Sequence, residues 1–106
     1  MIFSVVITAG VPSSFISNQC LGTGCTGGAI AITAVSETRL SVEQTTLDSN
    51  YADANGGGIY IDNTLTQAFA LTLTSNTILT NIAKTSGGFV YVSQTALSTT
   101  NKVSNC

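Results

Sequence analysis

The sequence has no His, no Trp and a single Pro in 106 residues, and only 8% of its residues are charged. The formal net charge is −2, so no basic stretch exists that would neutralise phosphates or anionic lipid. This composition argues against nucleic acid and acidic membranes as partners. Without His, it also lacks the residue most often used for proton transfer and a common ligand of zinc. We therefore expect no cofactor and no metal.

Polar uncharged residues and apolar residues make up most of the chain. It contains 17 Thr, 12 Ser and 8 Asn, and hydrophobic types still reach 43%. This mixture lacks the low hydrophobicity and high charge of disordered chains. Thr, Val and Ile favour strands, whereas the residues that usually cover helices are scarce. The apolar start, residues 1–10, has no basic flank and is too short to span a membrane, so we expect a single domain of strands and no membrane insertion.

An internal repeat organises the chain. Glycine pairs followed by a short apolar strand occur three times, 29 and 31 residues apart, at Gly27-Gly28, Gly56-Gly57 and Gly87-Gly88. An apolar residue followed three positions later by Asn precedes each pair, and these asparagines are Asn18, Asn50 and Asn81. A third apolar stretch lies seven residues before Leu47 and Ile78, and its counterpart in the first copy lies within residues 5–7.

The repeat predicts an all-β fold, a parallel β-helix of about three coils with about 30 residues and three short strands in each. The coils cover roughly residues 1–32, 33–61 and 62–92, and residues 93–106 form a partial coil. Equivalent strands would stack in parallel, about 4.8 Å apart. Because side chains alternate along a strand, Ile30, Ile59 and Val90 would point inward. Tyr60 and Tyr91 would then form an outer aromatic ladder above Ala31.

The glycines and asparagines suit the turns of such a coil. A sharp turn needs a positive φ or a missing Cβ, and the six paired glycines supply both. Asn18, Asn50 and Asn81 are expected to form an internal ladder, in which their amides bond to turn backbones and to one another. The alternative is that each of these residues occupies an unrelated loop.

Two of these motifs resemble a known family. Phe15-Ile16-Ser17-Asn18 followed by Gly27-Gly28-Ala29-Ile30 is similar to the F-x-x-N and G-G-A-[ILV] repeats of polymorphic outer-membrane proteins. The resemblance covers roughly residues 5–92, and copies two and three are degenerate. It implies a right-handed parallel β-helix of the pectin-lyase-like kind and a surface-exposed, adhesion-related or structural role. Proteins of that family carry many more repeats and a separate membrane barrel.

Two activities known for β-solenoids fit the repeat poorly. Polysaccharide lyases and hydrolases need clustered carboxylates, but alignment of the copies puts Asp48 under Leu79, Asp53 under Lys84 and Asp62 under Ser93. Ice binding needs a regular Thr array. The counterparts of Thr72 and Thr74 in the second copy are Ser41 and Glu43. We therefore predict that the chain is not an enzyme.

The three cysteines predict one short disulfide and one further thiol. Cys20 and Cys25 flank Leu21-Gly22-Thr23-Gly24, which is flexible enough to close a loop of about six residues. Cys106 would lie about three coils away, roughly 14 Å at one strand spacing per coil, and is a candidate for an intermolecular contact. A reduced Cys20 and Cys25 pair is the alternative in a reducing compartment.

Together these observations predict a structural building block of an extracellular or cell-surface filament or layer. It would self-assemble through its open ends or its faces, because bare solenoid ends expose unpaired strands. One alternative is an adhesin-like module whose Tyr60 and Tyr91 form a flat surface for glycans. Another is that the sequence is a fragment of a longer β-helix surface protein.

Overall fold

We describe a computed structural model of the chain for residues 2–7, 13–33, 37–63, 69–94 and 99–104. Every regular element in these ranges is a β-strand, and none is a helix. The strands are β1 (Ile2–Ile7), β2 (Ser13–Ile16), β3 (Gln19–Cys20), β4 (Ile30–Thr33), β5 (Glu37–Glu43), β6 (Thr45–Asp48), β7 (Tyr51–Ala52), β8 (Ile59–Asn63), β9 (Phe69–Thr74), β10 (Thr77–Leu79), β11 (Ile82–Ala83), β12 (Val90–Gln94) and β13 (Thr99–Ser104).

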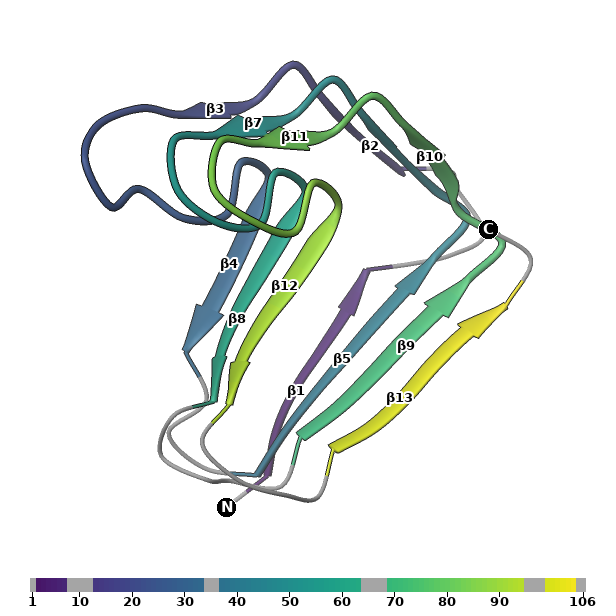
Figure 1. Cartoon of the computed structure of the whole chain (residues 1–106). Coiled ribbons are helices and arrows are strands. Elements are labelled where there is room, and N and C mark those ends of the chain that lie inside the picture. The colour runs from purple at the N-terminus through teal and green to yellow at the C-terminus, as the bar shows by residue number, and fades with distance from the viewer. Residues whose placement is uncertain (1, 8–12, 34–36, 64–68, 95–98, 105–106) are drawn as a thin grey trace.

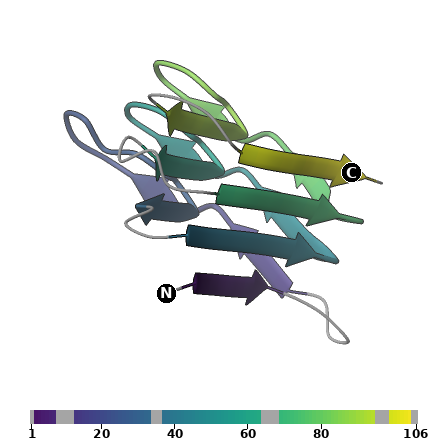
Figure 2. The same ribbon diagram turned by 90° about the horizontal axis from the view of Figure 1, so that it is seen from below.

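The strands form four parallel sheets, each built from equivalent strands of successive repeats. Sheet A has the order β1-β5-β9-β13, sheet B has β10-β6-β2, sheet C has β11-β7-β3 and sheet D has β12-β8-β4. Each strand therefore pairs with the strand four places along the chain. Sheets A and D face each other, and sheets B and C close the side between them (Figure 1). Seen from below, the repeats lie one above another in chain order (Figure 2).

The register between repeats is the one that the sequence alignment predicts. Ile30 pairs with Ile59 and Ile59 with Val90, all in parallel strands. The first copy of the third apolar stretch is β1, in which Val5 pairs with Leu40. The repeat therefore gives the pairing partners correctly, and every strand pair among the described residues is parallel.

The number of strands in each repeat differs from the prediction of three. The structure has four, because a sharp turn interrupts the segment around each predicted asparagine. The residue before each asparagine has a positive φ, 56° at Ser17, 56° at Ser49 and 50° at Thr80. This left-handed conformation ends the strand. The strand that follows is two residues long, which is too short to show alternating hydrophobicity in the sequence.

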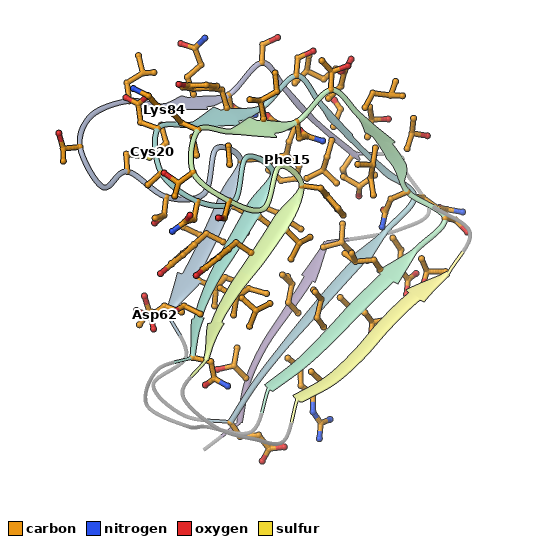
Figure 3. The ribbon with its side chains drawn as sticks, in the orientation of Figure 1. Phe15, Cys20, Asp62 and Lys84 are labelled. Atoms are coloured by element: carbon orange, nitrogen blue, oxygen red, sulfur yellow. A yellow bond between two sulfur atoms is a disulfide. The ribbon has the colours of Figure 1, made fainter. Side chains whose placement is uncertain are left out.

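The apolar core lies between the sheets, and its side chains are most fully buried in the middle repeat. Leu47, Ile59 and Ile61 are fully buried, and β8 alternates buried and half-buried residues as a one-sided strand should. Their counterparts in the outer repeats, including Phe15, Ile78 and Val90, are only partly buried against this core. Figure 3 labels Phe15 near the junction of the sheets.

Candidate functional site

A stack of three asparagines crosses the turn between sheets B and C. The Oδ1 atom of Asn50 accepts hydrogen bonds from the backbone N–H and the side-chain amide of Asn18, at 3.1 and 3.0 Å. The Nδ2 atom of Asn50 donates to Oδ1 of Asn81 at 2.8 Å and to the carbonyl of Phe15 at 2.9 Å. The structure thus brings together the three residues predicted to form the asparagine ladder.

A second asparagine turn, between sheets A and B, was not predicted. Oδ1 of the buried Asn76 accepts a hydrogen bond from the N–H of Thr45 at 2.9 Å, and its Nδ2 donates to the carbonyl of Val42 at 2.9 Å. Ser75 before it also has a positive φ, 54°. The signal in the sequence was the dipeptide Ser-Asn, which occurs at 17–18, 49–50, 75–76 and 104–105, where Asn105 lies outside the described residues. At the first three positions it marks a left-handed residue followed by an amide that bonds to the neighbouring repeat.

The paired glycines are required for two different reasons. The first of each pair has a positive φ, 75° at Gly27, 70° at Gly56 and 68° at Gly87. In the first two pairs the second glycine has no room for a side chain, because a Cβ on Gly28 or Gly57 would overlap the carbonyl oxygen of the equivalent glycine in the next repeat. The glycine pairs thus set the turn and the close contact between repeats.

The predicted disulfide joins Cys20 and Cys25, with 5.5 Å between their Cα atoms. It closes a loop that is inserted only in the first repeat, and Cys106 lies outside the described residues. The loop holds Asp53 of the next repeat, because the N–H of Gly22 donates a hydrogen bond to Asp53 Oδ2 at 2.6 Å. Figure 3 labels Cys20 and Lys84 at this corner of the molecule. No sequence pattern pointed to the contact between the loop and Asp53.

An open hollow of about 480 Å³ lies beside the disulfide loop. Its lining residues come from all three repeats and are Gly22, Thr23, Gly24, Asp53, Ala54, Lys84 and Thr85. Asp53 and Lys84 give it one group of each charge. Such a shallow, mixed-charge surface lacks the apolar walls and converging polar groups of a typical small-molecule site.

Removal of the disulfide is expected to lower stability by about 2 kcal/mol, the loop-entropy value for a closed loop of about six residues. The Cys20→Ser/Cys25→Ser double variant would test this in urea denaturation, with the wild-type protein in reducing buffer as a second comparison. The far-ultraviolet circular dichroism should keep its strand signal, because the loop lies outside the core. An unchanged denaturation midpoint in both experiments would contradict a stabilising role for the bridge.

The neighbours of Asp53 favour the charged form of its carboxylate. The Gly22 N–H, then the Tyr51 hydroxyl and the positive charge of Lys84, hold the pKa of Asp53 below its ordinary value. The Tyr51 hydroxyl donates to Asp53 Oδ1 at 2.8 Å. This hydrogen bond, followed by desolvation and the negative charge of Asp53, raises the pKa of Tyr51.

The lowered pKa of Asp53 predicts a loss of stability in acid. The unfolded chain has the ordinary aspartate pKa of about 3.9, so it binds a proton at a higher pH than the folded chain. The contribution of Asp53 is therefore complete above that pH and disappears as the pH falls through the folded pKa. Urea denaturation at a series of pH values between about 5 and 2 should show a smaller decrease for Asp53→Asn than for wild type. Equal decreases would show that Asp53 contributes nothing to the acid response.

Tyr60 and Tyr91 form the outer ladder that the repeat predicts. Their rings are parallel within 2° and their centroids are 5.7 Å apart, and the two residues pair across β8 and β12. The rings are stacked, so they turn their faces toward each other. The flat surface for a glycan that we expect from these two rings stays a prediction.

The three aspartates lie in separate rows, as the alignment predicts. Asp48 pairs with Leu79, and Asp62 pairs with Ser93. Asp53 faces the loop and the charge of Lys84 instead of a second acid. Within the described ranges, no three His, Cys, Asp or Glu side chains gather as a metal-binding group. The same ranges contain no helix with the length and hydrophobicity needed to cross a membrane.

Comparisons of the chain with protein-family models, with curated proteins and with solved structures found no significant match.

Proposed function

We propose that this chain is a right-handed parallel β-helix and a non-catalytic building block of an extracellular or cell-surface filament or layer. Successive chains would join end to end, so that the last repeat of one chain continues into the first repeat of the next. The resemblance of its F-x-x-N and G-G-A-[ILV] motifs to polymorphic outer-membrane protein repeats is consistent with this role. The disulfide Cys20–Cys25 suits an oxidising, extracellular compartment.

The path of the chain supports the β-helix part of the proposal. In Figure 1 the chain runs up sheet A, across sheets B and C and down sheet D, turning counter-clockwise. Figure 2 shows that the repeats advance in one direction, from β1 to β13. That direction is toward the viewer of Figure 1, which is the sense expected of a right-handed coil. Right-handed crossovers are also the strong preference between parallel strands.

The exposed ends of the stack are the observation that carries the assembly part. Leu47, Ile59 and Ile61 are fully buried because repeats lie on both sides of them. Ile78 and Val90, their counterparts in the third repeat, are only partly buried. Among the described strands, β10, β11 and β12 have a partner on one side only. Another repeat placed there would bury the apolar side chains and pair the free strand edges.

The distribution of acids supports a non-catalytic role. Glycoside hydrolysis by the common mechanisms requires two carboxyl groups that flank one bond. Asp48 and Asp62 lie opposite Leu79 and Ser93 of the next repeat, and Asp53 is held by Gly22 and Tyr51. No two of these three aspartates occupy paired positions on neighbouring strands.

Gly88 allows a direct test of end-to-end stacking. A Cβ on Gly57 would overlap the carbonyl of Gly88, whereas a Cβ on Gly88 would approach only the backbone of Asn81, at 3.0 Å. In an end-to-end assembly, the first repeat of the added chain would place a glycine carbonyl next to Gly88, as Gly88 places its own carbonyl next to Gly57. A Cβ on Gly88 would overlap that carbonyl. The Gly88→Ala variant should therefore fold but should not join to a second chain. Ser93→Ala, on the outward face of the end strand β12 that follows Gly88, is the matched control.

Light scattering and electron microscopy of the purified protein, together with its intact mass, would measure assembly. We expect polymers of the 10.8 kDa chain for wild type and for Ser93→Ala, and a folded monomer for Gly88→Ala. A wild-type protein that stays monomeric at all concentrations would refute the proposal. Polymers that form equally well from Gly88→Ala would refute end-to-end joining.

A further inference from the structure

The aromatic ladder on sheet D ends abruptly at the first repeat. The outward row consists of Ala31 on β4, Tyr60 on β8 and Tyr91 on β12, which pair in register. The Tyr91 ring is stacked against one face of the Tyr60 ring, with 5.7 Å between the ring centroids. On the opposite side of Tyr60 the row continues with Ala31, which is exposed and carries only a methyl group. The Tyr60 face that is directed toward β4 therefore has no ring stacked on it within this row.

The spacing of the strands leaves room for one ring beside Tyr60 in this row. Neighbouring strands of a sheet are about 4.8 Å apart, and carbon atoms in contact are about 3.5 to 4.0 Å apart. A ring lying over Ala31 would thus contact the Tyr60 face in the way that the Tyr91 ring does from the other side. The methyl group of Ala31 would form the floor of this position.

Polar groups border the position on one side. Thr33 and Asp62 lie two residues beyond Ala31 and Tyr60, on the same outward face, and they pair with each other in register. Thr33 is exposed and Asp62 is half-buried. Figure 3 labels Asp62 on the outer side of sheet D. A carboxylate has about four acceptor positions, so Asp62 can accept hydrogen bonds from a ligand beside any bond that it already makes.

We propose that this notch, formed by Ala31, Thr33, Tyr60 and Asp62, binds one neutral pyranose ring of a glycan. The apolar C–H face of the sugar would lie on the Tyr60 ring. Its hydroxyl groups would donate to the Asp62 carboxylate and to the Thr33 hydroxyl. A sugar matches this surface because it combines an apolar face with several donors at its edge, and the notch offers an aromatic face next to acceptors. The notch lies on the outer face of sheet D, over its edge strand β4, so it adjoins the end at which the proposed assembly would place another chain.

Filling the notch tests the proposal without removing any existing group. In the Ala31→Tyr variant a third tyrosine would occupy the position of the sugar and extend the ladder. The fold should accept it, because the backbone geometry is the same in each repeat. The distance from the preceding glycine shows this similarity. A Cβ placed on Gly27 would lie 2.8 Å from the Cβ of Ala31, and a Cβ placed on Gly87 would lie 2.7 Å from the Cβ of Tyr91, so the Cβ atoms of Ala31 and Tyr91 occupy equivalent positions. The second variant, Tyr60→Phe, keeps the ring face and removes only the hydroxyl.

The probes are soluble hexasaccharides of β-1,4-linked glucose, α-1,4-linked glucose and β-1,4-linked galactose, with p-cresol as a planar ring without sugar hydroxyls. Saturation-transfer NMR and titration should show binding of at least one hexasaccharide to wild type. We expect a loss of affinity of about tenfold or more in Ala31→Tyr and in Tyr60→Ala, and near wild-type affinity in Tyr60→Phe. Asp62→Asn should weaken binding less than Ala31→Tyr, because an amide oxygen still accepts a hydrogen bond.

Any of the following results would overturn the proposal. The first is that none of the three hexasaccharides binds to wild type. The second is that binding persists unchanged in Ala31→Tyr. The third is that p-cresol competes at the notch as strongly as the sugars bind, or that the notch seats a second copy of the chain, seen as a dimer that Ala31→Tyr abolishes.

Discussion

Replacing Gly57 with alanine is expected to destabilise the fold by about 3 kcal/mol or more, the upper range for overpacking a tight site. The added Cβ would overlap the carbonyl oxygen of Gly88 and would lie 2.5 Å from the backbone of Ile82. Both neighbours are backbone atoms in the next repeat, so no side-chain rotation relieves the contact. The repeats must move apart, which lengthens the hydrogen bond between the Gly57 N–H and the carbonyl of Gly87, now 3.0 Å.

Gly88→Ala is the matched control, since it makes the same chemical change at the equivalent position of the last glycine pair. Its Cβ would meet only the Asn81 carbonyl, at 3.0 Å, so a shift of a few tenths of an ångström accommodates it. Urea denaturation followed by circular dichroism, at a protein concentration where the chain is monomeric, should show a much lower midpoint for Gly57→Ala than for Gly88→Ala. Equal midpoints would mean that contact between repeats is not what requires glycine.

The parallel sheets could be predicted because equivalent residues recur at nearly constant spacing. Once the glycine pairs were aligned, the partners of Ile59 and Tyr60 followed without further assumptions, since stacking in parallel places each residue next to its equivalent. The asparagine ladder followed in the same way. The disulfide was predictable because Cys20 and Cys25 are separated by a short, glycine-containing segment.

Other features depend on contacts that have no periodic signal. The two-residue strand β7 is visible only through its hydrogen bonds to neighbouring repeats, such as that from the Tyr51 N–H to the Asn18 carbonyl at 2.9 Å. Asn76 has no asparagine at the equivalent position of the second repeat, where Thr45 stands, so alignment of the copies did not reveal it. The bond from Gly22 to Asp53 joins an insertion of one repeat to a carboxylate of the next, and each occurs only once.

The buried side chain of Asn50 makes four hydrogen bonds. It is completely buried, accepts two hydrogen bonds from Asn18, and donates to Phe15 and Asn81. Asn18 is exposed, and within the described part of the chain its side-chain amide donates one hydrogen bond, to Asn50 at 3.0 Å. The two residues occupy equivalent positions in neighbouring repeats, so they form a matched pair for mutation.

Asn50→Ala is therefore expected to cost about 3 to 5 kcal/mol, because each buried polar group left without a partner costs about 1 to 3 kcal/mol. The carbonyl of Phe15 would lose its donor, and the N–H of Asn18 would lose its acceptor. Asn18→Ala should cost about 1 kcal/mol, since the backbone N–H that bonds to Asn50 remains. Asn50→Asp separates hydrogen bonding from packing, because it keeps the shape but places an oxygen where Nδ2 donates to Phe15 and Asn81. If the ladder stabilises through these bonds, Asn50→Asp will denature in urea at least as early as Asn50→Ala. If Asn50→Asp instead stays close to wild type, the volume of the side chain matters more than its amide, and the ladder is a packing feature.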